Sequence, residues 1–213
     1  MLITNAHIIN EGHEIAADLL IKNGRIEKIA KQITAPAGTV VYDAKGQWLL
    51  PGVIDDQVHF REPGLTHKAT IFTESRAALA GGVTSFMEMP NTSPPTFTHE
   101  LLEQKYDIAA QTSLANYSFF MGTSNDNTDE VLRTNDKKDR VCGIKIFMGS
   151  STGNLLVDNY LTLNRIFAGT ELLIATHCED EDIIHANLAR LKVENRELTA
   201  ADHPLIRNEE ACF

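Results

Sequence analysis

The 213-residue chain has little cysteine and no long apolar run, and these two absences limit the classes of protein to which it can belong. Its three cysteines are widely spaced and form no Cys-x-x-Cys pair, so we expect reduced thiols rather than a disulfide framework or a zinc ribbon. The apolar stretches stay far below the roughly 20 residues that span a bilayer, so no membrane partner is expected. The N-terminus also lacks the basic start and apolar core of a secretory signal. We therefore expect a cytoplasmic protein.

Positive charge is scarce as well. Lysine and arginine number 19 against 29 aspartates and glutamates, which gives a formal net charge of −10. Proteins that bind nucleic acid carry an excess of basic residues on at least one face, and no basic run occurs here, so we expect no nucleic-acid partner. The hydrophobic fraction of 43% is ordinary for a globular protein with a core and excludes a disordered or collagen-like chain.

Residues 1–50 predict a small β domain. Asn23-Gly24 separates two short apolar runs and favours a hairpin, because both residues accept the positive φ of a type I′ turn. Pro51-Gly52 then marks the boundary with a second domain, residues 51–213.

The second domain alternates short apolar or β-branched runs with helical periodicity, which is typical of βα units around a parallel sheet. The five predicted strands are Gly52–His59, Val83–Met89, Ala115–Met121, Cys142–Met148 and Leu172–His177. One predicted helix ends at Gly81-Gly82 in a left-handed cap, and another begins behind an Asp158 N-cap. A closed barrel has eight strands and about 250 residues, so five βα units predict a smaller open sheet or an unfinished barrel.

Polar side chains gather where the predicted strands end. They are Asp55, Gln57, His59, Arg61, Asn91 and His177. In a parallel βα barrel the carboxyl ends of the strands converge, so we expect these residues to form one site. Lys145 lies inside the otherwise apolar fourth strand, where a buried ammonium is costly unless it is paired or chemically altered.

These residues belong to an ordered series of motifs. The series runs Asp55-Asp56-Gln57-Val58-His59-Phe60-Arg61-Glu62-Pro63-Gly64, Gly81-Gly82-Val83-Thr84, Met89-Pro90-Asn91-Thr92, Gly143-Ile144-Lys145 and Thr176-His177-Cys178-Glu179. It resembles the N-terminal portion of dihydroorotase, a cyclic amidohydrolase of the amidohydrolase superfamily. The resemblance implies an α/β fold: an amidohydrolase-type (β/α)8 barrel, truncated after the fifth βα unit, with a small N-terminal β domain.

The resemblance also implies a zinc site with one or two ions. His59, Lys145 and His177 match family ligands, and Lys145 stands where a lysine is carboxylated to bridge two metals. Gln57 replaces the first histidine of the family's His-x-His, and an amide oxygen is a poorer zinc ligand than imidazole, so we expect a weakened first metal position. Asp55 matches an aspartate that orients the ligands without touching the ion.

Three further residues match family positions that bind substrate. Arg61 and Asn91 match residues that hold the substrate carboxylate, and a guanidinium suits the anionic dihydroorotate because it grips a carboxylate with two parallel hydrogen bonds. Thr152 lies where relatives have a loop whose threonine contacts the substrate. The implied reaction interconverts dihydroorotate and N-carbamoyl-L-aspartate in de novo pyrimidine biosynthesis, with metal-activated water. The family's general acid/base aspartate would lie beyond Phe213, so we expect no catalytic acid/base within this chain.

Two other functions remain open. Gln57 and the missing C-terminal ligands favour a non-catalytic dihydroorotase-like scaffold that partners aspartate transcarbamoylase. An allantoinase- or hydantoinase-type relative shares the Pro-Gly and Met-Pro stretches, although hydantoinase-type enzymes act on uncharged rings and do not need Arg61. With the fifth strand as an open edge, we also expect the chain to form homo-oligomers.

Overall fold

A computed structural model of the chain describes residues 1–149, 153–193 and 197–212. The chain divides into two compact units, Met1–Val53 and Ile54–Phe213. Within the described ranges, no helix is both long and apolar enough to cross a membrane.

The first unit is a five-stranded sheet. Its strands are β1 (Leu2–Asn10), β2 (His13–Lys22), β3 (Arg25–Ala30), β4 (Val41–Asp43) and β5 (Trp48–Leu49). Their order is β3-β2-β1-β4, and β5 pairs with β1 beside β4. The predicted hairpin is confirmed: β2 and β3 pair antiparallel, and the turn residues Asn23 and Gly24 have φ of 51° and 72°. The small core of this unit consists of Ala6, Ile8, Ala17, Leu19 and Ala44.

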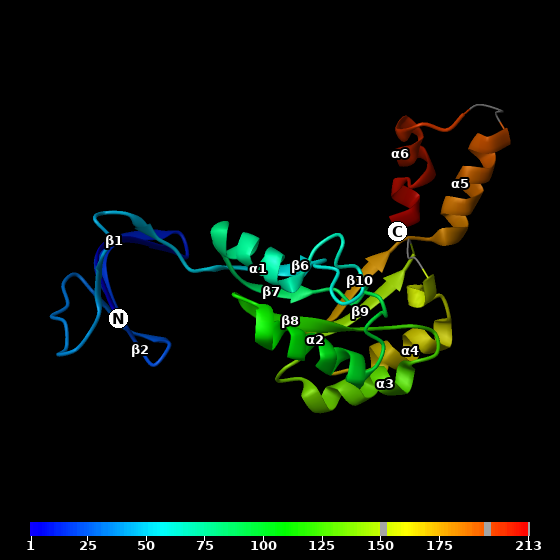
Figure 1. The fold of residues 1–213 in the computed structure, drawn as a ribbon. Helices are drawn as coiled ribbons and strands as arrows, with labels where there is room; N and C mark the ends of the chain where they lie inside the picture. The colour runs from blue at the N-terminus through cyan, green and yellow to red at the C-terminus, as the bar shows by residue number, and fades with distance from the viewer. Residues whose placement is uncertain (150–152, 194–196, 213) are drawn as a thin grey trace. The chain divides into compact units, whose positions relative to one another are not determined.

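The second unit is a curled half-barrel of five parallel strands (Figure 1). The strands are β6 (Val53–Val58), β7 (Val83–Glu88), β8 (Asn116–Gly122), β9 (Gly143–Met148) and β10 (Ile174–Cys178). They follow one another in chain order across the sheet, from β6 at one edge to β10 at the other. The predicted amidohydrolase-type barrel is therefore confirmed in its class, with five of the parallel strands present in this chain.

The helices are α1 (Ile71–Ala80), α2 (His99–Thr112), α3 (Thr128–Leu132), α4 (Tyr160–Gly169), α5 (Glu181–Val193) and α6 (His203–Ile206). Helices α1 to α4 lie between successive strands along the chain, and α5 and α6 follow the last strand. Short 3₁₀ turns lie at Arg133–Lys137, Gly153–Leu155, Ala200–Asp202 and Glu209–Cys212. In Figure 1, α2, α3 and α4 lie along one face of the sheet, while α5 and α6 pack against each other beyond the carboxyl end of β10.

The ends of two helices test the predicted caps. Gly82 takes the left-handed conformation after α1, with φ of 87°, as predicted. The predicted Asp158 cap of α4 is wrong: the side-chain oxygen of Asn159 accepts the N–H groups of Leu161 and Thr162 instead. The Oδ1 of Asp158 accepts a hydrogen bond from the side chain of Asn125 at 2.8 Å.

An aromatic cluster fills the space between the sheet and α2. The ring of Phe86 on β7 lies 4.5 Å from that of Phe60, and Tyr106 of α2 meets Phe119 of β8 edge-on at 4.9 Å between centroids. Phe86 and Phe119 are almost completely buried. Such pairs stabilise a core beyond the area they bury. The cluster thereby fixes the carboxyl ends of β6 and β7, where the predicted site residues begin.

Candidate functional site

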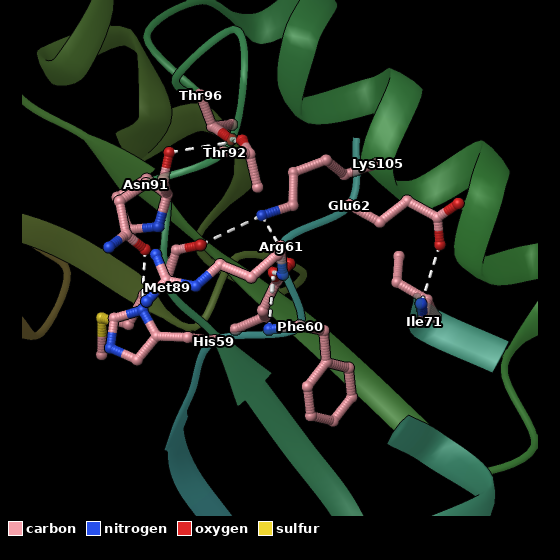
Figure 2. A network of polar contacts seen from close by, with 12 residues as sticks. His59, Phe60, Arg61, Glu62, Ile71, Met89, Asn91, Thr92, Thr96 and Lys105 are labelled. Atoms are coloured by element: carbon pink, nitrogen blue, oxygen red, sulfur yellow. Dashed lines mark hydrogen bonds and ion pairs between the residues drawn. The ribbon is translucent and has the colours of Figure 1, made fainter. Parts of the chain in front are cut away.

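His59 and Asn91 follow neighbouring strands and are joined by a hydrogen bond. The Nδ1–H of His59, just after β6, donates to the side-chain oxygen of Asn91, just after β7, at 2.7 Å (Figure 2). Because Nδ1 carries this proton, Nε2 of the neutral ring keeps its lone pair for a ligand. The amide nitrogen of Asn91 also remains a hydrogen-bond donor. The pair thus offers one metal-binding atom and one anion-binding group side by side.

Burial favours the neutral form of His59. Loss of hydration is the main cause that lowers the pKa of His59 below its ordinary value, and the hydrogen bond to Asn91 opposes this shift. The positive charges of Arg61 and Lys145 lower the pKa of His59 further. A neutral imidazole is the form that binds a metal ion.

Arg61 brings a guanidinium to the same place. Figure 2 shows its side chain extending toward Asn91 and His59. Its backbone has φ of 68°, a left-handed conformation that side chains other than glycine adopt at a cost. The surrounding structure must therefore hold this residue in its unusual conformation.

Lys145 is the buried ammonium that the sequence predicted. Its residue is 4% exposed, and among the described residues no hydrogen bond or ion pair involves its Nζ, which lies 4.7 Å from the centroid of the Phe147 ring. Burial lowers the pKa of Lys145 below its ordinary value, with a weak opposing effect of Cys178. A lowered pKa enlarges the neutral amine fraction, which is the form that reacts with carbon dioxide. An anionic carbamate at this position with a bound cation would resolve the burial of an unpaired charge, so the residue fits a metal-bridging role.

His177 lies on the same face of the sheet as Lys145. The parallel register pairs Lys145 with Ala175 and Phe147 with His177, and residues two apart on a strand share a face. The side chain of His177 is 44% exposed, and its Nε2 lies 2.7 Å from Oε2 of Glu179. The same carboxylate oxygen pairs with Arg207. In this chain, one ring nitrogen of His177 is therefore held by a carboxylate.

The remaining predicted residues are less tightly placed. Gln57 is exposed and shares the strand face of His59, and its backbone N–H donates to Oδ1 of the half-buried Asp55 at 3.2 Å. Thr152 lies outside the described residues. No group of three or more His, Cys, Asp or Glu residues that could hold a metal occurs within the described ranges. Of the predicted zinc ligands, Lys145 and Gln57 are not residues of these four types.

Two residues at this site were missed by sequence reasoning. Glu88, the last residue of β7, and Lys105 of α2 form a buried ion pair with 2.6 Å between Nζ and Oε2. A signal existed for the lysine, because Lys105 stands three residues after Leu102 and four before Ala109, within the apolar stripe of its helix. A charged residue in such a stripe requires a partner inside the protein.

The fold and the strand-end residues together define the class of protein. A parallel half-barrel that follows a small β unit in the sequence is consistent with part of the amidohydrolase fold, and the chain superposes on the L-hydantoinase (dihydropyrimidinase) of Arthrobacter aurescens with a TM-score of 0.89 at 25% identity. It superposes on the D-hydantoinase of a Thermus species with a TM-score of 0.77 at 27% identity. Each superposition covers 99% of this chain, and 47% and 46% of those two chains.

Sequence comparison then gives the family. The dihydro-orotase-like family model matches residues 46–186, so the chain belongs to the dihydro-orotase-like family. A dihydroorotase of Methanosarcina acetivorans is 37% identical over 182 residues, and one of Listeria welshimeri is 33% identical over 191 residues. These alignments cover 84% and 88% of this chain but 38% and 44% of the relatives. The chain thus spans less than half the length of the curated relatives it matches.

Proposed function

We propose that the protein carrying this chain is a metal-dependent cyclic amide hydrolase that interconverts dihydroorotate and N-carbamoyl-L-aspartate in pyrimidine biosynthesis in the cytoplasm. The observation that carries the proposal is the grouping of Arg61, Asn91 and His59 at the ends of two adjacent strands (Figure 2). The names of the curated relatives, dihydroorotases, support the same substrate.

The residues of this chain have separate tasks in the proposed reaction. Arg61 and the amide nitrogen of Asn91 bind the carboxylate of dihydroorotate and orient the ring. His59 through Nε2, Lys145 as a carbamate, and His177 would hold one or two zinc ions, and Gln57 would be a weak additional ligand. To bind zinc, His177 would have to release its Nε2 from Glu179 or bind through Nδ1. When bound, zinc supplies Lewis acidity toward the ring carbonyl and lowers the pKa of water.

The substrate of the protein tests this proposal. We expect the zinc-loaded protein that carries this chain to convert dihydroorotate to N-carbamoyl-L-aspartate, and to act far more slowly on the uncharged rings of hydantoin and allantoin. Turnover of hydantoin or allantoin above that of dihydroorotate would instead assign the protein to those relatives.

A specific observation favours a second function. Gln57 is an exposed amide where the family pattern has an imidazole ligand. The second candidate is accordingly a non-catalytic scaffold that binds aspartate transcarbamoylase or a second copy of itself. Three results together would establish this function in place of the first. The protein would contain no zinc by elemental analysis, would not turn over dihydroorotate, and would co-elute with aspartate transcarbamoylase.

A further inference from the structure

The ion pair between Glu88 and Lys105 lies directly behind the loop that carries Arg61. Their side chains are 0% and 1% exposed. Lys105 extends from α2 toward the end of β7, where its Nζ also donates to the backbone oxygen of Met89 at 3.2 Å (Figure 2). The pair therefore ties one helix to the end of the strand that precedes Asn91.

The second oxygen of Glu88 binds the backbone of the neighbouring loop. Its Oε1 accepts the N–H groups of Phe60 and Arg61, each at 3.2 Å. Two successive backbone N–H groups that converge on one anion form a recognised anion-binding arrangement, which requires a left-handed residue in the loop. The positive φ of Arg61 is that conformation. The carboxylate of Glu88 thus compensates the backbone strain at Arg61.

Stability by itself does not account for this pair. Burial is the main cause that raises the pKa of Glu88, and burial likewise lowers the pKa of Lys105, so each charged form is disfavoured by loss of water. Apolar residues of similar volume often stabilise a core as well as such a pair does or better. Apolar side chains could not accept the N–H groups of residues 60 and 61. The pair therefore supplies geometry that an apolar replacement would lose.

We propose that Glu88, held by Lys105, is a positioning residue that sets the direction of the Arg61 side chain and thereby the preference of the site for anionic over uncharged cyclic amides. The substrate preference rests on the proposed function, whereas the positioning of the loop does not. The ring of Phe60 packs against Phe86 and holds the start of the same loop, while Glu88 binds the backbone N–H groups of Phe60 and Arg61.

The decisive variant combines Glu88→Leu with Lys105→Met in this chain. It leaves no unpaired buried charge, so the fold should persist, but it removes the acceptor for the two N–H groups. We expect amide hydrogen exchange at Phe60 and Arg61 to accelerate by about tenfold or more, because a hydrogen bond to a charged group is lost. Amides of β9, such as Ile146, should exchange as in the unmodified chain.

Glu103→Gln is the matched control. Glu103 lies on the same helix and forms ion pairs with Lys137 and Arg140, away from the loop. It should leave exchange at Phe60 and Arg61 unchanged. The positioning role would be overturned if exchange at Phe60 and Arg61 stays constant in the double variant. It would also be overturned if exchange there rises only by the factor seen in β9. If the double variant does not fold, Glu88→Gln alone is measured in the same way, because it keeps an acceptor but removes its charge. Faster exchange at Phe60 and Arg61 than in the unmodified chain supports the positioning role, and unchanged exchange overturns it.

Kinetics separate this inference from the proposed function. In the active protein, the double variant should lower kcat/KM for dihydroorotate at least about tenfold relative to hydantoin, through a raised KM. An unchanged ratio in a protein that does hydrolyse dihydroorotate would overturn the substrate-preference role and leave the proposed function intact. A protein that hydrolyses no dihydroorotate, but shows the local change in exchange, would overturn the proposed function and the substrate preference while supporting the positioning of the loop.

Discussion

The backbone of Ser93 lies so close to Gly64 that no side chain fits between them. A Cβ built on Gly64 would stand 1.8 Å from the backbone oxygen of Ser93, and the N–H of Ser93 donates to the backbone oxygen of Pro63 at 3.2 Å. Gly64 also has φ of 85°, which glycine adopts without strain. The loop after β6 and the loop after β7 therefore pack backbone against backbone, and this contact brings Arg61 and Asn91 together.

Gly64→Ala should destabilise the chain by about 3 kcal/mol or more, because it combines overpacking against backbone with a strained φ. Urea denaturation followed by circular dichroism measures the loss. Gly12→Ala is the control: φ there is 76°, but no atom lies within 4 Å of the added Cβ. The two variants should differ in stability, and equal losses would show that the contact with Ser93 is not the cause.

Lys145→Met should raise the unfolding free energy of the metal-free chain by about 1 kcal/mol, since it removes a buried lysine whose Nζ has no hydrogen bond or ion pair among the described residues, and keeps most of the side-chain volume. The same change should lower zinc content in elemental analysis of the active protein. Lys68→Met, at an exposed position, is the control for both measurements. A destabilised metal-free variant with unchanged zinc content would show that Lys145 serves the fold and not a metal.

Arg61→Gln should raise the KM for dihydroorotate by about 10- to 100-fold, the range expected for losing hydrogen bonds to a charged group. Turnover of uncharged hydantoin should change little, because that ring carries no carboxylate. Steady-state kinetics with both substrates provide the measurement, and Arg76→Gln at an exposed position on α1 is the control. A parallel loss with both substrates would argue against a carboxylate-binding role.

Cys142 should react slowly with alkylating reagents. Burial raises the pKa of its thiol to about 11 from an ordinary value of 9.0. At pH 8 its thiolate fraction should be about 100-fold lower than that of an ordinary thiol, while the exposed Cys178 and Cys212 are modified first. Mass spectrometry of peptides after timed treatment with iodoacetamide gives the three rates. Equal rates at all three cysteines would contradict the burial effect.

The raised pKa of Cys142 also makes the stability of the fold depend on pH. Between about pH 9 and pH 11 the unfolded chain releases the Cys142 proton and the folded chain keeps it, so the contribution of this group to the unfolding free energy falls as pH rises. Cys142→Ala should remove this part of the pH dependence. Identical alkaline stability curves for the unmodified chain and the variant would refute it.

The sequence by itself was sufficient for the strands of the parallel sheet and for the N-terminal hairpin. Turn chemistry at Asn23-Gly24 and apolar periodicity along the βα units are local properties, and the strands formed within a few residues of their predicted ends. The short helices α3 and α6 were not predicted, and the cap of α4 was misassigned, because Asp158 and Asn159 are both good capping residues. In the folded chain Asn159 caps the helix, while Asp158 accepts a hydrogen bond from Asn125, which lies far away in the sequence.

For the site, the sequence determined which residue types stand at the strand ends, and the tertiary structure decided which of them meet. The hydrogen bond between His59 and Asn91, and those from the two N–H groups after β6 to Glu88, depend on the pairing of β6 with β7 and on the contact of Lys105 with Glu88. The apolar stripe of α2 indicated that Lys105 is buried, but periodicity does not say which side chain it contacts. Hydrogen-bond partners separated along the chain are fixed by packing, and packing exists only in the folded state.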